Sequence, residues 1–155
     1  MYVQNLSGQQ KEPRAIVKSF DADFQFVGNI GDRLFFYTNY KASNYKVIEI
    51  TAKAPMESMW RDYVPENKNE TLKSAVFCWK GLLLHYLVDA SSKIYVCSID
   101  GKRIKDINFK DIGTVDAISG SPADTNVFIS YTTYTSPATI YRYNMKTQSI
   151  ALQFG

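Results

Sequence analysis

The sequence predicts an all-β protein: a partial β-propeller of about three four-stranded antiparallel blades, plus the outer strands of a preceding blade. Three observations predict this fold. Aromatic residues make up 14% of the 155 residues, and they favour the half-buried surface of a sheet. A strand–turn–strand pattern recurs three times along the chain. Small polar residues, Gly and Pro fall between the strands, where tight turns need them.

The repeated pattern is an apolar or aromatic strand, a small-polar turn and a second strand. Ile94-Tyr95 in the second copy and Ile140-Tyr141 in the third copy lie 46 residues apart, and the first two copies begin 49 residues apart. Four short strands in roughly 45–50 residues is typical of a propeller blade, whereas a meander sandwich, the structural rival, does not explain the period. The copies are RLFFYTNYKASNYKVIEIT from Arg33, LLLHYLVDASSKIYVCSID from Leu82 and VFISYTTYTSPATIYRYNM from Val127, with turns at Lys41–Asn44, Asp89–Ser92 and Thr135–Ala138.

Each hairpin has one further predicted strand before it and one after it. Asp100-Gly101 predicts a type I′ turn, in which both central residues need a positive φ. Only Ala52–Met59 has the pattern of a helical turn. The strands before the hairpins are Phe24–Ile30, Leu72–Trp79 and Gly113–Ser119, and those after them are Trp60–Pro65, Arg103–Phe109 and Gln148–Phe154.

The chain length predicts one domain, 1–155, which the strands divide into blades at 21–66, 70–110 and 112–155. Tyr2–Leu6 and Ala15–Phe20, within 1–20, predict two outer strands of a preceding blade. Closed rings have about four to eight blades. We therefore expect a fragment of a larger ring, with open blade faces through which the fragment could associate with itself.

Composition excludes several classes of function. The net charge is only +3, and the densest basic run, Lys102–Lys105, is followed by acidic residues, so we expect no nucleic-acid partner. No apolar run is long enough to span a membrane, so we expect a soluble protein, and the sequence leaves open whether its compartment is the cytoplasm or the periplasm. Cys78 and Cys97 lie in predicted strands, which favours two buried free thiols over a disulfide or a metal site. We expect no cofactor.

The residues needed for hydrolysis are not present in a recognisable pattern. No Gly-x-Ser-x-Gly occurs, and Ser121 in Gly120-Ser121-Pro122 falls between two predicted strands with no helix after it. The single histidine, His85, lies in an apolar strand and is expected in the core or at an interface. The pairs Asp21 with Asp23 and Asp111 with Asp116 are explained by turns. We assign no catalytic, cofactor-binding or metal-binding residue.

Several segments, taken in order, resemble the propeller of the prolyl oligopeptidase family of serine peptidases. They are the Thr38-Asn39 pair with its Ala-Ser-Asn-Tyr continuation, Trp60 with Pro65-Glu66, and Ser136-Pro137 ahead of Ile140–Tyr143. The resemblance covers essentially the whole chain. It implies the last three blades of a seven-bladed propeller and the outer part of the blade before them, followed in the parent protein by an α/β-hydrolase domain.

Two functions follow from the resemblance and from the residues. The first is a non-catalytic propeller segment that helps to gate the access of short proline-containing peptides to a hydrolase domain, which would be its partner and would cleave after proline. The second is a stand-alone propeller-like module that binds a peptide, glycan or protein, because tyrosine-rich strands suit interface contacts. Neither function assigns a reaction to this chain.

Overall fold

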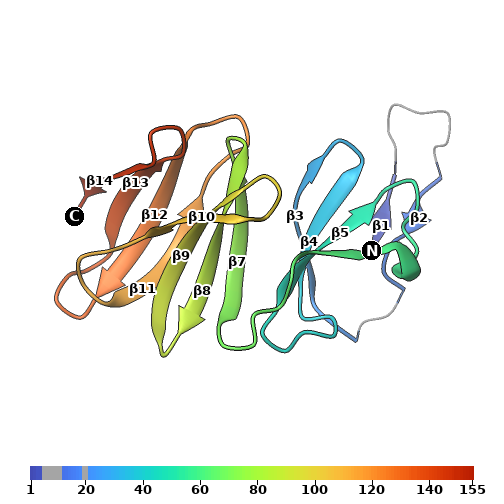
Figure 1. Ribbon diagram of the computed structural model, residues 1–155, viewed down its shortest axis with the longest axis horizontal. Coiled ribbons are helices and arrows are strands. Elements are labelled where there is room, and N and C mark those ends of the chain that lie inside the picture. Colours follow the sequence, from blue (N-terminus) through green and yellow to red (C-terminus); the bar gives the residue numbers. More distant parts are fainter. Residues whose placement is uncertain (5–11, 19–20) are drawn as a thin grey trace. The chain divides into compact units, whose positions relative to one another are not determined.

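The computed structural model describes residues 1–4, 12–18 and 21–155, and the regular elements there are strands except for one short 3-10 helix. Three four-stranded antiparallel sheets are present, together with a two-stranded pair of β1 (Tyr2–Val3) and β2 (Arg14–Ala15) (Figure 1). The predicted all-β class and four-stranded blades are confirmed. The chain forms two compact units, Met1–Glu66 and Asn67–Gly155.

The first unit contains one four-stranded sheet. Its strands are, in sheet order, β3 (Phe24–Ile30), β4 (Arg33–Thr38), β5 (Lys46–Thr51) and β6 (Arg61–Val64). Between β5 and β6 lies the 3-10 helix η1 (Glu57–Met59), inside the segment predicted to form a helical turn. One sheet face places Phe36 opposite Ile48, and these two side chains pack with Ile16 and Ile50 into a small core.

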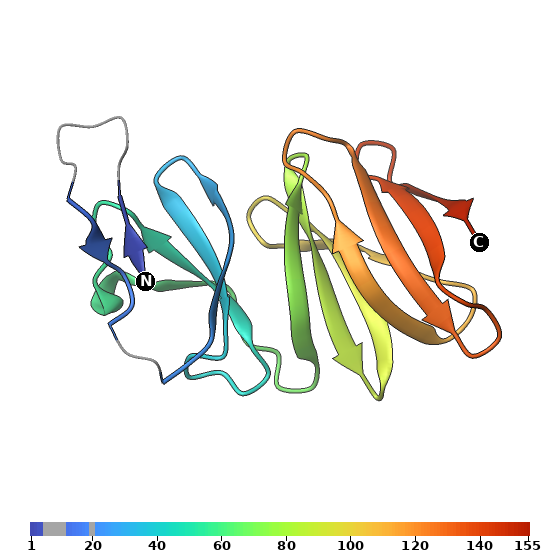
Figure 2. The ribbon, with the colours of Figure 1, turned by 180° about the vertical axis from the view of Figure 1, so that it is seen from behind.

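The second unit contains two sheets that pack face to face (Figure 2). A period of two places alternate side chains on the shared face; in β12, for example, Val127, Ile129 and Tyr131 are buried. The first sheet has the order β7 (Thr71–Cys78), β8 (Gly81–Val88), β9 (Ser91–Ser98), β10 (Arg103–Ile107), and the second has the order β11 (Gly113–Ser119), β12 (Asn126–Thr133), β13 (Thr139–Asn144), β14 (Ser149–Phe154).

Two turn predictions are wrong in detail. The two-residue turn with positive φ at both positions is Asp89-Ala90, at 47° and 61°, so Ser91 and Ser92 belong to β9. At Asp100-Gly101 only Gly101 has a positive φ, 80°, and its N–H donates to the Ser98 carbonyl oxygen at 2.9 Å. That geometry is a three-residue connection with a glycine bulge, and a separate register shift follows between Arg103 and Lys105.

Two strand predictions also need correction. Phe109 was predicted inside a strand, but β10 ends at Ile107 because the chain there leaves its own sheet. The early strands are shorter than predicted: β2 begins at Arg14 and ends at Ala15, while residues 5–6 and 19–20 lie outside the described part of the chain. In the described ranges, no helix is long and apolar enough to cross a membrane.

Candidate functional site

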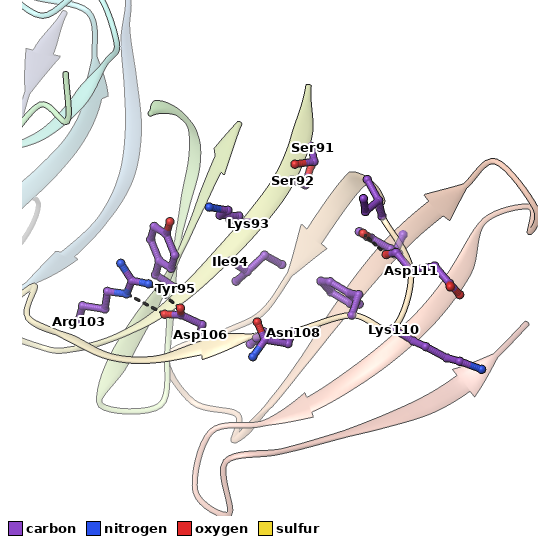
Figure 3. Close-up of a pocket in the computed structure, with 14 residues that line it drawn as sticks. Ser91, Ser92, Lys93, Ile94, Tyr95, Arg103, Asp106, Asn108, Lys110 and Asp111 are labelled. Atoms are coloured by element: carbon purple, nitrogen blue, oxygen red, sulfur yellow. Dashed lines mark hydrogen bonds and ion pairs between the residues drawn. The ribbon is translucent and has the colours of Figure 1, made fainter. Parts of the chain in front are cut away.

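A recess of the second unit lies between the start of β9 and the segment that links β10 to β11 (Figure 3). It has a volume of about 410 Å³. Asn108–Ile112 bow away from β9 as the chain crosses to the other sheet, so no strand pairs with the start of β9 on that edge. Ser91–Tyr95, Arg103, Asp106, Ile107, Asn108–Ile112 and Tyr131 line the recess.

The linking segment is held in place by aromatic packing. The Phe109 ring stacks on Tyr131, with centroids 4.0 Å apart and planes 12° apart, and meets Tyr141 edge-on at 5.2 Å. The Tyr131 hydroxyl donates to the Asp111 carbonyl oxygen at 2.9 Å. Offset and edge-on ring pairs add stabilisation beyond the area they bury. The recess is therefore formed before any ligand arrives.

One end of the recess is closed by a charge pair. Arg103 donates from Nε to Asp106 Oδ1 at 2.7 Å, and its guanidinium lies 3.7 Å from the centre of the Tyr95 ring. The hydrogen bond from Arg103 holds the pKa of Asp106 below its usual value. Burial, and then the hydrogen bond to Glu70, raise the pKa of Tyr95. Neither group is set up to exchange protons near neutral pH.

His85 is buried, as predicted, and it contacts a serine that the sequence analysis did not associate with it. Its Nε2 lies 2.9 Å from Ser92 Oγ, and the Val115 N–H of β11 donates to the same oxygen at 2.9 Å. Burial, with a smaller effect of Lys73, lowers the pKa of His85 to about 4, so the ring is neutral at pH 7. The neutral ring can accept a hydrogen bond from the Ser92 hydroxyl, and Ser92 then connects the two sheets.

This Ser92–His85 pair is built for structure. Both side chains are buried, with exposed fractions of 8% and 7%, and the serine oxygen is already hydrogen-bonded to Val115. Ser121, the other serine considered, is exposed in the turn between β11 and β12, where its Oγ accepts the Ala123 N–H at 3.3 Å.

One carboxylate of each pair considered as catalytic is used in a local hydrogen bond. Asp23 accepts the Tyr45 hydroxyl at 2.9 Å, and Asp116 accepts the Thr132 hydroxyl at 2.6 Å. Across 1–4, 12–18 and 21–155, no three His, Cys, Asp or Glu side chains gather in a way that could hold a metal ion.

The two cysteines are free and buried, as predicted. Burial raises the pKa of Cys78 to about 12 and that of Cys97 to about 11, so both remain thiols at pH 7.

The residues that carry the family resemblance in the first unit hold its loops together. Asn39 Oδ1 accepts the Asp23 N–H at 2.7 Å, and Glu66 Oε1 accepts the Asn44 N–H at 2.8 Å. Trp60 donates from Nε1 to the Pro55 carbonyl oxygen at 3.0 Å, and its ring meets Phe24 at 5.7 Å. These contacts explain why Asn, Glu and Trp occur at those positions without any ligand.

Ser92, Phe109 and the Arg103–Asp106 pair line the recess but were not predicted from the sequence as residues of a site. A usable signal was present for Ser92. A two-residue turn at Asp89-Ala90 fixes the register of β8 on β9, which puts His85 and Ser92 on the same face of the sheet. For Phe109 the strand pattern itself was misleading.

Comparison with known proteins gives one family and a consistent set of relatives. The model of the "Prolyl oligopeptidase, N-terminal beta-propeller domain" matches residues 1–153. The chain is similar to prolyl oligopeptidase ophP of Omphalotus olearius, at 36% identity over 126 residues, and to a prolyl endopeptidase of Elizabethkingia miricola, at 25% over 130 residues. These alignments cover 80% and 84% of this chain but only 17% and 18% of the two relatives.

Solved structures give the same result. A structure from a study of two prolyl endopeptidases superposes with a TM-score of 0.85 at 26% identity, covering 94% of this chain and 21% of that one. Prolyl oligopeptidase B of Galerina marginata without ligand superposes with a TM-score of 0.86 at 25% identity, covering 97% of this chain and 22% of that one. The chain thus spans about a fifth of the length of these proteins.

Proposed function

Because this chain belongs to the prolyl oligopeptidase N-terminal β-propeller domain family, we propose that it is a non-catalytic propeller segment that helps to gate the access of short proline-containing peptides to a hydrolase domain. The observation that carries the proposal is the superposition of its four-stranded sheets on the structure of a prolyl endopeptidase with a TM-score of 0.85. The blade sections 21–66, 70–110 and 112–155 are part of the same proposal.

The proposed gate works by exclusion. A rigid wall around a reaction chamber leaves a narrow entrance. A flexible short peptide can pass through it, and a folded protein is too wide to do so. The second unit is suited to form such a wall, because its two sheets share a core and the Ser92 hydroxyl links them. The hydrolase domain would supply the nucleophile, the general base and the bond-breaking step.

The proposal includes that this chain has no reaction of its own. In support, His85 and Ser92 are buried and bonded to structural partners, and Ser121 lies in a strand–turn–strand segment, where a nucleophilic serine of this family's type needs a strand–turn–helix elbow.

The proposal also includes association through an exposed sheet face. Phe128 and Phe154 are 41% and 68% exposed, and Phe128 points away from the core that Val127 and Ile129 form. In the isolated chain we expect a second copy to cover this face, so light scattering should give a mass above that of the monomer. A monomer at high concentration contradicts this part of the proposal.

The second candidate is a module that binds a partner without gating a reaction. The preformed recess beside β9 is the observation that favours it. If the chain is a gate, its function requires an attached hydrolase domain. If it is a binding module, it binds its partner without that domain.

A chimera tests the gating function. The segment aligned with this chain in the Elizabethkingia miricola enzyme would be replaced by residues 1–155. We would then compare the cleavage of a free proline-containing peptide of about 8 residues with the cleavage of a segment of about 40 residues that is part of a folded substrate protein. We expect the chimera to cleave the short peptide and to retain the parent's discrimination against the long one. A folded chimera that cleaves both at similar rates contradicts the proposal. The matched control is the Elizabethkingia miricola enzyme that carries its own segment at the same junctions.

A further inference from the structure

The strand β9 is longer than its outer neighbour. It runs from Ser91 to Ser98, but β10 pairs with it only from Ile94 to Cys97. Ser91–Lys93 are paired with β8 on one side, and on the other side they face the recess under the bowed segment Asn108–Ile112. A stretch of strand edge without a strand partner presents main-chain hydrogen-bonding groups, here into a recess, since Ser92 is only 8% exposed.

The register shows which residue presents them. The Ser98 N–H donates to the Lys102 carbonyl oxygen at 2.9 Å, so Ser98 turns its main chain toward the β10 side. In an antiparallel ladder every second residue does so. Val96, Ile94 and finally Ser92 therefore point the same way. Ser92 is the residue whose N–H and C=O groups face the recess.

A strand added at this edge would place its side chains in a defined way. The residue opposite Ser92 directs its side chain to the same face of the sheet as Ser92, since directly paired residues share a face. That face is the one packed against β11–β14, where Ile94, Ile107 and the Phe109–Tyr131 stack form an apolar floor. An apolar side chain fits that floor.

The adjacent side chains of an added strand would lie on the opposite face, beside Lys93. Lys93 is exposed and its charge acts on Asp106, the carboxylate that also pairs with Arg103, so one negative charge faces two positive charges here. Lys110, also exposed, adds another positive charge at the rim, and the exposed Asp111 beside it adds a negative one, which leaves the charged lining net positive. A carboxylate next to the apolar residue complements this rim.

We propose that the recess beside β9 binds a short extended peptide segment by strand addition to Ser92, with an apolar residue opposite Ser92 and an acidic residue next to it. The segment continues the line of β10 past Ile107. It pairs through main-chain groups, which give affinity without a fixed sequence, and the floor and the lysine rim select the side chains. The site is independent of the proposed gating function, since it needs no hydrolase domain.

The test is an NMR titration of the ¹⁵N-labelled chain with the peptide acetyl-Thr-Ile-Glu-Val-amide. We expect a dissociation constant of about 1 mM, as suits one strand pair and one pocket, and shifts confined to the amides of Ser91–Lys93 and Asn108–Ile112. Methylating the isoleucine nitrogen removes the N–H that pairs with the Ser92 carbonyl group and is expected to weaken binding at least about tenfold.

The charge pattern is tested with a matched pair of variants. Lys93→Gln should weaken binding of the Glu peptide about two- to threefold and leave binding of the matching Gln peptide unchanged. Lys146→Gln, the same charge change on an exposed turn away from the recess, should alter neither.

Three results overturn the proposal. The first is the absence of shifts at 10 mM peptide in a chain whose spectrum is folded. The second is binding that the N-methylated peptide reproduces. The third is movement of the Ser91–Lys93 amides with protein concentration alone, because the edge is then occupied by a second copy of the chain.

Discussion

The two units are built from the same four-stranded module but bury it to different extents. In the second unit, two sheets face each other over a core cluster that draws on both, whereas the single sheet of the first unit packs one face on Ile16 and its neighbours. Among the described residues, the cluster shared by the two sheets has eleven buried members and the cluster around Ile16 has four. In the first unit the other face of the sheet is also buried, since Phe35 and Val47 are 0% exposed, so each sheet depends on cover for both faces.

The largest expected effect comes from a matched pair of core truncations. Ile129→Ala in the second unit and Ile48→Ala in the first remove equivalent side chains with exposed fractions of 0% and 2%, and each should cost about 3–4 kcal/mol of unfolding free energy. Hydrogen exchange should show that each variant loses protection within its own unit. If either substitution reduced hydrogen-exchange protection in both units, the division of the chain into two separately stabilised units would be contradicted.

The next effect separates the units by pH. The pKa of His85 is about 4 in the folded chain, against 6.5 for a free histidine. Between those values the unfolded chain binds more protons, so stability is complete above about pH 6.5 and falls as pH drops toward 4, by about 2–3 kcal/mol. Urea titrations at pH 7 and pH 4.5 that report on amides of each unit should place the loss in the second unit.

A control variant tests whether His85 causes that loss. His85→Gln removes the titrating ring, so the difference in stability between the two pH values should shrink by most of its size. Equal pH dependence in this variant and in the parent chain would mean that carboxylates, not His85, carry the effect.

A smaller effect compares two charge pairs of the same chemistry. Arg33 donates to Glu49 with both Nε and NH2, at 2.8 and 2.7 Å, and Arg103 pairs with Asp106 in the same way. Glu49 is 15% exposed and Asp106 41% exposed. Glu49→Gln should therefore lower the free energy of unfolding of the first unit by about 1 kcal/mol, and Asp106→Asn should lower that of the second unit by only about 0.3 kcal/mol. Thermal unfolding at low salt measures the loss of stability in both variants. A larger loss for Asp106→Asn than for Glu49→Gln would contradict this prediction.

The smallest effect concerns a buried hydroxyl in the second unit. Tyr143 is 1% exposed, and its hydroxyl group has no hydrogen-bond partner among the described residues. Removing an unsatisfied buried polar group relieves its desolvation cost, so Tyr143→Phe should leave stability unchanged or raise it by up to about 1 kcal/mol. A loss above about 1 kcal/mol in chemical denaturation would show that the hydroxyl has a partner in solution.

Much of the fold could be predicted because its strands repeat. Phe24–Ile30 and Gly113–Ser119 are strands over the predicted residues, and the Thr135–Ala138 turn lies between β12 and β13. Period-two patterns and turn chemistry are local, so a single sequence reveals them. Tyr141 and Tyr143 of the last hairpin pack on the core side of their sheet.

The recess could not be predicted in the same way, because its parts meet only in three dimensions. Phe109 is apolar and follows a strand pattern, yet it leaves β10 to stack on Tyr131, which is 22 residues later in the sequence. Ser92 resembled a turn residue and is instead the oxygen that joins two sheets. Non-local contacts of this kind decide the end of β10, and strand propensity does not.

The central claim is that this chain contributes a wall and no reaction centre. The most direct measurement is hydrolysis of a fluorogenic proline-containing peptide by the purified chain. We predict no turnover above the buffer rate at any pH between 5 and 9. Clear turnover that disappears in Ser121→Ala, in a variant whose folding is verified, would contradict the claim.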